Sequence, residues 1–207
     1  LTHSDGVICC ELKLRDIKMN KIDENVTEIV VELKDKAYDL FVDVHYTAYY
    51  NEDVITQYVT VRNQEKGKVD VEHLASSYLP LQASSYYLTH FYGAWSKEMH
   101  LKEEELTNGV KSIESVKGVR TSQCESPAFV LSLNGKSQES TGEIYGGALA
   151  CSGNYKLSFQ INEDRMLNIV SGMNPFAAAL SLDNGEEVET PEMVLTYSGE
   201  GKNRMSQ

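Results

Sequence analysis

Residues 40–50 read Leu40-Phe-Val-Asp-Val-His-Tyr-Thr-Ala-Tyr-Tyr50, a run in which apolar even positions alternate with a mixed set of odd ones. Successive side chains of a β-strand point to opposite faces of its sheet, so this two-residue rhythm predicts a strand with one apolar face. The same rhythm recurs along the chain, at 29–33, 59–61, 129–133, 155–161 and 193–197. We therefore expect roughly nine or more strands and little helix.

The connections between these strands carry turn-forming residues. Asn134-Gly135, Gly153-Asn154 and Asp183-Asn184-Gly185 each separate two alternating runs and predict hairpins. The charged run 97–105 has few apolar positions and predicts a solvated loop or a sheet edge. No Pro-, Gly- or Ser-rich linker and no fixed repeat divides the sequence. The expected fold class is all-β, a large antiparallel β-sandwich that spans residues 1–207 as a single domain, with edges for a neighbouring domain or subunit to cover.

Composition excludes several classes of partner. The formal net charge of −12 and the pI near 4.9 argue against a nucleic-acid partner, because phosphate-binding surfaces need clustered Lys and Arg. The apolar stretches are too short to span a bilayer, so we expect no membrane partner. Residues 1–6 do not form a signal peptide, although a targeting segment could lie upstream or have been removed.

The four cysteines, at positions 9, 10, 124 and 151, show neither the CxxC pairs of a zinc site nor the density of a disulfide scaffold. Cys9 and Cys10 are expected to lie in a strand, on opposite faces, where they cannot bridge each other. Free thiols favour a reducing compartment. We expect a cytoplasmic protein, with a periplasmic or secreted one as the alternative.

Catalytic signatures are missing from the sequence. It contains no GxSxG, GxxxxGK[ST], HExxH or GxGxxG motif, and its five histidines never stand at HxH or HxxxH spacing. Acidic residues are scattered through charged runs such as 103–105 and 185–187, which are typical of solvated faces. We therefore expect no catalytic residue, no metal site and no cofactor in this chain.

The aromatic cluster Tyr87-Leu-Thr-His-Phe-Tyr-Gly-Ala-Trp-Ser-Lys-Glu98 holds the only tryptophan, Trp95. A tryptophan face stacks on the C–H side of sugar rings, but it is also a large apolar group that proteins bury in cores and interfaces. His90, Tyr92 and Trp95 are thus candidates for contacts with carbohydrate or with a neighbouring subunit. Gly93 would let a ligand or another backbone approach closely.

Two loops supply further candidates. Arg120, in the segment 118–127, could fork onto a carboxylate or bridge to a neighbouring domain, or it could simply order the loop through one ion pair. Asn174 belongs to Gly172-Met-Asn-Pro-Phe176, where the Asn-Pro pair turns the chain and Phe176 is expected to return to the core.

Several segments resemble, in combination and in order, the N-terminal domain of family 36 α-galactosidases. They are 87–98, 109–115, 118–127, 142–149, 152–155, 173–176 and 190–198. The opening, residues 2–6, resembles a strand start that follows a further N-terminal stretch in the family, and 199–207 resembles the family's passage into a catalytic (β/α)8 barrel. On this resemblance the domain is N-terminally incomplete and is truncated before the barrel. Gln123-Cys124-Glu125 departs from a histidine-bearing approach to the strand in many relatives.

The resemblance implies a super-sandwich related to galactose mutarotase-like folds. It implies full enzymes that release terminal α-linked galactose from oligosaccharides such as melibiose and raffinose, with retention and without cofactors. Both catalytic aspartates of the family belong to the barrel. The chain is therefore expected to be inactive alone, and to serve as a scaffold for its own barrel and for subunit contacts in a homo-oligomer, which is frequently a tetramer in this family.

Two rivals come from other functional classes. One is an autonomous carbohydrate-binding module that uses Trp95 and the many tyrosines, although tyrosines are common in strands for structural reasons. The other, ranked lowest, is a mutarotase-like sugar epimerase in which His90 and a carboxylate would act as base and acid.

Overall fold

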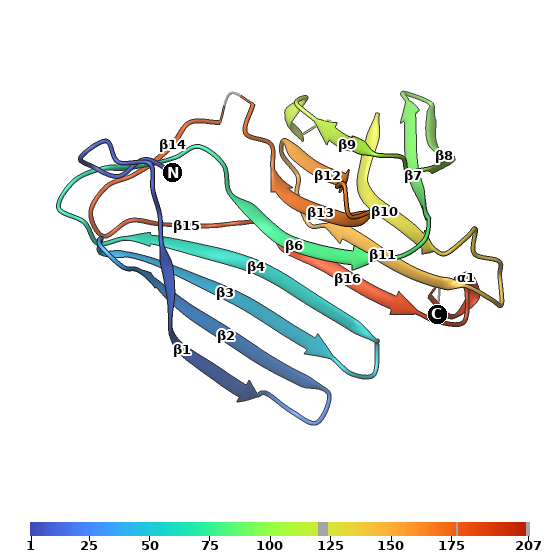
Figure 1. The fold of residues 1–207 in the computed structure, drawn as a ribbon, viewed down its shortest axis with the longest axis horizontal. Coiled ribbons are helices and arrows are strands. Elements are labelled where there is room, and N and C mark those ends of the chain that lie inside the picture. The colour runs from blue at the N-terminus through green and yellow to red at the C-terminus, as the bar shows by residue number, and fades with distance from the viewer. Residues whose placement is uncertain (120–123, 177, 206–207) are drawn as a thin grey trace.

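Antiparallel strands make up almost all of the regular structure in the computed structural model, which describes residues 1–119, 124–176 and 178–205. Within these ranges the strands form a ten-stranded, a four-stranded and a two-stranded sheet, and the single α-helix is the short α1 (Lys202–Met205). Every strand pairing is antiparallel. The prediction of an all-β antiparallel fold is confirmed (Figure 1).

The large sheet contains β1 (Leu12–Lys21), β2 (Val26–Asp35), β3 (Leu40–Tyr49), β4 (Val54–Asn63), β7 (Tyr86–Ala94), β8 (Lys97–Glu105), β10 (Glu125–Leu133), β11 (Glu143–Leu149), β15 (Glu187–Glu189) and β16 (Met193–Ser198). Their spatial order is β1-β2-β3-β4-β16-β11-β10-β7-β8, and β15 pairs with β4. The four-stranded sheet contains β6 (Ala75–Gln82), β9 (Gly109–Ser115), β12 (Tyr155–Ile161) and β13 (Met166–Met173), in the order β6-β13-β12-β9. The two-stranded sheet pairs β5 (Val69–Val71) with β14 (Leu180–Leu182).

The four-stranded sheet covers one end of the large sheet, and we call β6, β7 and β9 to β13 the closed half (Figure 1). Buried apolar side chains from both layers form its core. Phe129 of β10 and Phe159 of β12 meet there edge to face, with ring centroids 5.0 Å apart. The alternating patterns at 129–133 and 155–161 thus supply the inner faces of two layers packed against each other.

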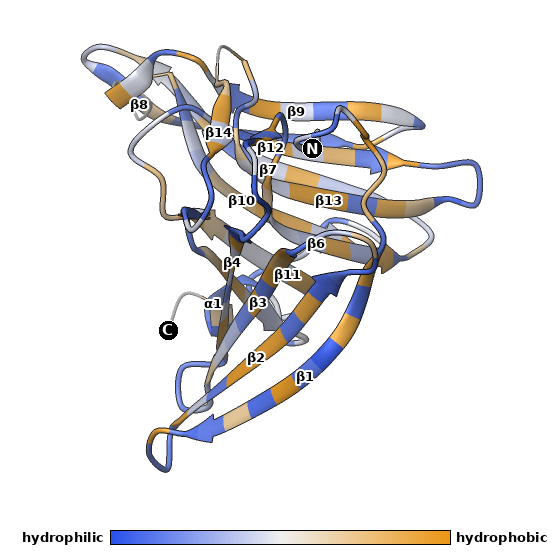
Figure 2. Ribbon diagram, turned by 90° about the vertical axis from the view of Figure 1, so that its left-hand side faces the viewer, coloured by the Kyte–Doolittle hydropathy of each residue, from blue (hydrophilic) through white to orange (hydrophobic). Residues whose placement is uncertain are grey.

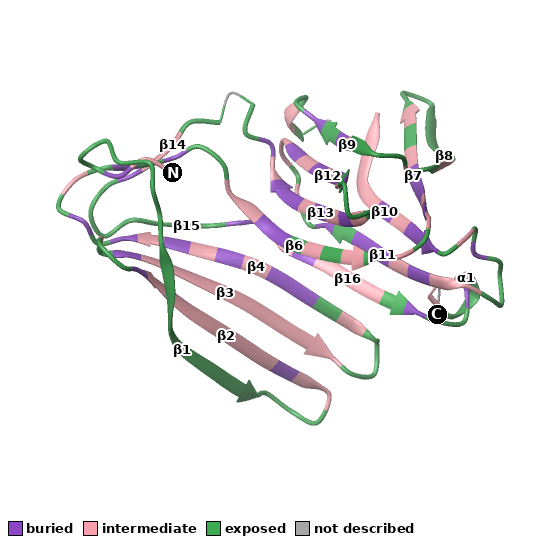
Figure 3. Ribbon diagram, viewed as in Figure 1, coloured by how far each residue is buried: buried purple, intermediate pink, exposed green. Residues whose placement is uncertain are grey.

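The strands β1, β2 and β3 extend beyond this sandwich, and we call them the wing. All ten residues of β1 are exposed, and most residues of β2 and β3 are only half-buried (Figure 3). A second, smaller core lies at the base of the wing, where Leu40, Val59 and Val61 meet β5 and β14. The rest of the wing has no second layer among the described residues.

A β-bulge in β1 keeps one face of the wing apolar. The pairing of β1 with β2 shifts between Leu14 and Asp16, so that Ile17 lies on the same face as Leu14 although three positions separate them. Cross-strand partners share a face, so three rows cross the wing. Hydrophilic and hydrophobic bands alternate along β1 (Figure 2). These rows are Leu14–Leu33–Val42, Ile17–Val31–Val44 and Met19–Ile29–Tyr46. The β1 residue of each row is exposed, whereas the β2 and β3 residues are half-buried.

The turn predictions have mixed outcomes. Asn134-Gly135 begins the connection between β10 and β11, which pair as predicted, and both residues have positive φ (59° and 137°). The hairpin predictions at Gly153-Asn154 and at Asp183-Asn184-Gly185 are wrong. The first connects β11 to β12 and the second connects β14 to β15, and in each case the chain changes sheet. The same turn-forming residues serve a hairpin and a crossover between layers.

The structure also tests the predictions for the charged run 97–105 and for the cysteines. The charged run 97–105 forms the edge strand β8, so the edge interpretation is confirmed. Cys9 and Cys10 precede β1 and are not in a strand, contrary to expectation. All four cysteines are free. Among the described residues no helix has the length and apolar character needed to cross a bilayer.

Candidate functional site

A surface cleft of about 550 Å³ brings together two of the predicted residues, Tyr92 and Asn174. It lies where β7, the end of β9, the start of β10 and the loop after β13 meet. Its lining mixes rings, carboxylates, an amide and a thiol, contributed by Tyr92, Gly93, Glu114, Ser115, Val116, Lys117, Cys124, Glu125, Asn174 and Phe176. Phe176 is 65% exposed at this cleft, so the expectation that it returns to the core is wrong.

Asn174 is buried and fixes the geometry of the cleft floor. Its side-chain nitrogen lies 3.3 Å from the carbonyl oxygen of Tyr155, 3.5 Å from that of Ser115 and 3.4 Å from a carboxylate oxygen of Glu114. Its side-chain oxygen accepts the backbone N–H of Phe176 at 2.9 Å. Both polar atoms of its side chain are engaged, so Asn174 acts first as a joint between β9, β12 and the loop.

His90 is buried beneath the cleft, between two carboxylates. Its Nδ1 lies 3.3 Å from Oε2 of Glu125, and its Nε2 lies 3.4 Å from Oε1 of Glu104, a contact within ion-pair distance but without hydrogen-bond geometry. Burial would raise the pKa of Glu104, but hydrogen bonds and charges from Lys111 and Lys102 outweigh it and lower that pKa. The carboxylates near His90 were not identifiable from the sequence, because they come from β8 and β10.

Trp95 stands apart from the cleft. It lies in the turn between β7 and β8 and is 80% exposed, so it is not part of the core of this chain. Gly93 does permit a close approach, and the approaching group is the backbone of β8, since an added Cβ would lie 2.4 Å from the carbonyl oxygen of Lys97. Arg120 lies outside the described residues. Of the four candidates in the described part of the chain, Tyr92 and Asn174 line the cleft, whereas His90 and Trp95 do not.

Four tyrosines line a second cavity, which the sequence did not reveal. This tyrosine groove, of about 310 Å³, is lined by Tyr46, Asp53, Ile55, Gln57, Tyr78, Leu79, Tyr145, Leu195, Thr196 and Tyr197. Tyr145 and Tyr197 are direct cross-strand partners in β11 and β16, with ring centroids 4.9 Å apart. The abundance of tyrosines was noted from the sequence, but the groove could not be located because it depends on which strands are neighbours. The helix α1 lies against β11 and β16 beside it.

A third group of polar residues gathers at the N-terminal end of the chain. His3, Cys10 and Asp35 each offer one ligand atom, and these atoms lie within 4.8 Å of one another. His3 and Asp35 are buried, while Cys10 is exposed. Desolvation of its sulfur, then the hydrogen bond to Asp35 and the negative charge of that residue, raise the pKa of Cys10 to about 11. Histidine spacing could not identify this group, because its members come from different segments.

The chemistry open to the cleft is limited by the partners of its charged groups. Glu114 contacts Lys156 at 3.4 Å as well as Asn174, and Glu125 contacts His90. His90 itself is buried and does not line the cleft. Both carboxylates of the cleft thus already have partners within this chain.

Comparisons with known proteins place these features in a family context. Residues 1–183 match the model of the glycosyl hydrolase family 36 N-terminal domain. The α-galactosidase Mel36A of Lactobacillus acidophilus is 31% identical over 187 residues, which cover 90% of this chain and 25% of that protein.

Solved structures agree with the sequence matches. The α-galactosidase AgaB of Geobacillus stearothermophilus superposes with a TM-score of 0.93 at 26% identity, covering 99% of this chain and 30% of that chain. A variant of AgaA from the same organism, in complex with raffinose, gives a TM-score of 0.92 at 25% identity, with 99% and 30% covered. This chain thus spans 25–30% of the length of these three proteins.

Proposed function

This chain belongs to the glycosyl hydrolase family 36 N-terminal domains, and we propose that it is the non-catalytic scaffold and oligomerisation domain of an α-galactosidase. The observation that carries the proposal is the coverage: 90% of this chain aligns with only 25% of Mel36A. The larger part of the relative would correspond to the (β/α)8 barrel implied by the resemblance of residues 199–207. The substrates of the whole protein would be terminal α-galactosides of oligosaccharides such as raffinose and melibiose, without a cofactor for hydrolysis.

The described site is consistent with a scaffold. Glycoside hydrolysis normally requires two carboxyl groups flanking a scissile bond. In the cleft, Glu114 and Glu125 are held by neighbouring side chains. His90 is buried below the cleft, which also weakens the epimerase alternative. The reacting groups would then come from outside this chain.

The tyrosine groove is the surface that we assign to the barrel. The helix α1 lies against β11 and β16 at the side of this groove, and Arg204 pairs with Asp53 of the groove lining at 3.1 Å. A polypeptide that continued beyond α1 would therefore start next to these rings. Covering them would bury Tyr78 and Tyr197, which are 57% and 47% exposed in this chain. Aromatic rings with a polar end are typical of such interfaces.

The apolar face of the wing is the surface that we assign to a neighbouring subunit. Leu14, Ile17 and Met19 are 60%, 56% and 71% exposed on one face of the edge strand. An extended apolar surface of this kind is typical of protein interfaces. To test it, Ile17→Lys in the whole protein is expected to lower the oligomeric state measured by light scattering. Asn20→Lys, which adds the same charge on the opposite face of β1, is the control. Equal oligomeric states of the two variants would refute the assignment.

Enzyme assays test the central proposal. The isolated 207-residue chain is expected to give no turnover of p-nitrophenyl α-galactoside, whereas the whole protein is expected to hydrolyse it. Turnover by the pure isolated chain would refute the scaffold role. Galactose mutarotation by the isolated chain would favour the epimerase alternative.

A carbohydrate-binding module is the second candidate, and the tyrosine groove is the observation that favours it. Four tyrosines of this groove could stack on sugar rings. Raffinose titration of the isolated chain distinguishes the two roles. Saturable binding that is lost in Tyr197→Ala would support the module at the groove, and loss in Trp95→Ala would place it at the β7–β8 turn.

We also infer a cytoplasmic location, with the periplasm or export as the alternative. Four free cysteines support a reducing compartment. Fractionation of the source cells, with thiol labelling of the native protein, tests this inference.

A further inference from the structure

We propose that His3, Cys10 and Asp35 form a zinc-type site that fastens the N-terminal segment to β2. The ligand atoms would be Nε2 of His3, Sγ of Cys10 and a carboxylate oxygen of Asp35, with water as the fourth ligand. One ligand atom from each of the three residues, a ring nitrogen in the case of His3, already lies within 4.8 Å of the others. Imidazole, thiolate and carboxylate are the donors that Zn²⁺ takes in proteins, whereas Mg²⁺ and Ca²⁺ prefer oxygen alone.

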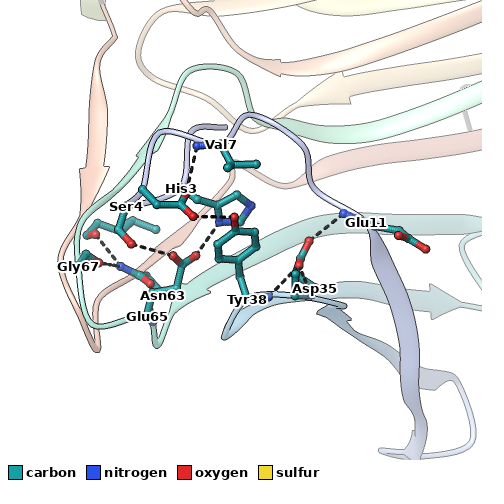
Figure 4. A network of polar contacts seen from close by, with 12 residues as sticks. His3, Ser4, Val7, Glu11, Asp35, Tyr38, Asn63, Glu65 and Gly67 are labelled. Carbon is teal, nitrogen blue, oxygen red and sulfur yellow. Dashed lines mark hydrogen bonds and ion pairs between the residues drawn. The ribbon is translucent and has the colours of Figure 1, made fainter.

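A buried ring nitrogen of His3 without a hydrogen-bond partner supports the site independently of the distances between the ligands. Nε2 of His3 is buried and has no hydrogen-bond partner, while Nδ1 of the same ring lies 2.7 Å from Oε1 of Glu65. A carboxylate at Nδ1 favours a proton on that nitrogen, which leaves a lone pair on Nε2. A buried polar atom without a partner is rare in native structures and calls for a ligand. Figure 4 shows the ring with Glu65 to one side and Asp35 to the other.

The His3 ring is held in place from several directions. It stacks on Tyr38 with ring centroids 3.7 Å apart and planes within 11°. Glu65 accepts the hydroxyl of Ser4 at 3.2 Å, and its backbone N–H donates to Asn63 at 2.8 Å. This arrangement is the carboxylate–histidine pair that orients metal-bound imidazoles in zinc proteins.

The side chains of Asp35 and Cys10 can each form a bond to a cation. Asp35 accepts the N–H groups of Ala37 and Tyr38 on Oδ1 and that of Glu11 on Oδ2, and it also accepts a hydrogen bond from the thiol of Cys10. Loss of the thiol proton would therefore free a carboxylate lone pair for the cation. Cys10 is exposed, so its sulfur can move. Zinc bonds of about 2.0–2.3 Å place ligand atoms roughly 3.4–3.8 Å apart. A rotation of the Cys10 side chain would close most of the remaining gap, and its thiol proton would leave to solvent.

Metal binding would tie residues 1–11 to β2, in addition to the contacts of His3 and Ser4 with Tyr38 and Glu65. Residues 1–11 contain no strand, and their main backbone contact to a sheet is the isolated bridge from Thr2 to Asp70. A cation bound by His3, Cys10 and Asp35 would join both ends of this segment to the last residue of β2. Since the metal binds only the folded arrangement, it should raise stability by mass action.

The test compares two adjacent cysteines in the whole protein. After chelator treatment, the wild type is expected to bind one more equivalent of Zn²⁺ per chain than Cys10→Ser, measured by equilibrium dialysis. Cys9→Ser, also exposed but outside the group, should bind as the wild type does. With Co²⁺ the wild type and Cys9→Ser should show a thiolate-to-cobalt charge-transfer band, and Cys10→Ser should lack it. Glu65→Gln is expected to keep the band and to weaken zinc affinity about 10–100-fold.

Equal zinc stoichiometry and equal cobalt spectra in the wild type and Cys10→Ser would overturn the proposal. So would loss of the band in Cys9→Ser with retention in Cys10→Ser. His3→Gln is a second variant, and it should also lose the additional equivalent. Circular dichroism of each variant separates loss of metal from loss of fold.

Discussion

The closed half and the wing are built from strands with the same alternating pattern, yet only one of them buries it. In the closed half the apolar positions meet those of a second sheet, and Leu131, Leu157 and Ile169 are at most 1% exposed. In the wing Leu14, Ile17 and Met19 of β1 are more than half exposed. Alternation therefore specifies a strand and its apolar face, whereas the number of layers above that face is decided by tertiary pairing.

The largest effect should come from a matched pair of isoleucines. Ile169→Ala, in the core of the closed half, is expected to lower the free energy of unfolding by about 2–5 kcal/mol, because it leaves a cavity. Ile17→Ala in the wing should change it by less than about 0.5 kcal/mol. Urea denaturation of the isolated chain measures both. Similar losses would mean that the wing folds against a layer of its own.

Two asparagines of different burial, Asn174 and Asn168, allow a second comparison of stability. Asn174→Ala removes the donor and the acceptor that join β9, β12 and the following loop, and it leaves the carbonyl of Tyr155 without this contact. We expect a loss of about 1–3 kcal/mol. The control is Asn168→Ala on β13, whose bond to Tyr78 is exposed and should contribute less. A larger loss for Asn168→Ala would contradict the burial difference.

A smaller effect is expected in the pH dependence of the free energy of unfolding, through Glu104. The folded-state pKa of Glu104 is lowered from 4.5, since Lys111 and Lys102 outweigh the effect of burial, and His90 of β7 also faces this carboxylate. A carboxyl with a depressed pKa contributes stability above its unfolded pKa, and this stability is lost as pH falls through the folded pKa. The free energy of unfolding of the wild type should thus fall more steeply below about pH 4.5 than that of Glu104→Gln.

The control for this titration is Glu105→Gln, an exposed neighbour on the same edge strand. It should preserve the acid slope of the wild type. Salt should also reduce the difference between the wild type and Glu104→Gln, because the stabilising lysines are partly exposed. An unchanged slope in Glu104→Gln would disprove the role of this cluster.

The smallest effect is expected at Trp95. Its side chain is 80% exposed, so Trp95→Ala should shift the free energy of unfolding of the isolated chain by no more than about 0.5 kcal/mol. The same substitution in the whole protein would lower oligomer stability if the ring contacts a subunit. A large loss of stability in the isolated chain would show that the β7–β8 turn packs more closely than described.

Much of the local structure could be predicted from the sequence. The run 155–161 coincides with β12, and 40–50 contains β3 with one residue beyond it. The edge character of 97–105 followed from its charges. The sheet to which each strand belongs could not be predicted, because Asn134-Gly135 and Gly153-Asn154 carry the same turn chemistry. The first connects neighbouring strands of one sheet, and the second connects two sheets.

The sites were harder to predict than the strands, for the same reason. Tyr92 and Asn174 meet at one cleft only because β7 and the loop after β13 converge there. The tyrosine groove requires β11 and β16 to be neighbours, and the group around His3 requires the chain start to return to the end of β2. Each of these sites depends on contacts between residues far apart in the sequence, and such contacts cannot be read from the spacing of residues along the chain.

The position of β1 at the end of the large sheet has a consequence for how such a domain behaves in concentrated solution. Its outer backbone groups have no strand beside them among the described residues, and an unpaired edge is a template for adding the strand of another molecule. Lys13, Arg15, Lys18 and Lys21 stand along this edge, and a copy that docked there would bring like charges together. The cationic side chains thus act as gatekeepers against fibrillar stacking, and they leave the apolar face of the same strand available for an ordered contact.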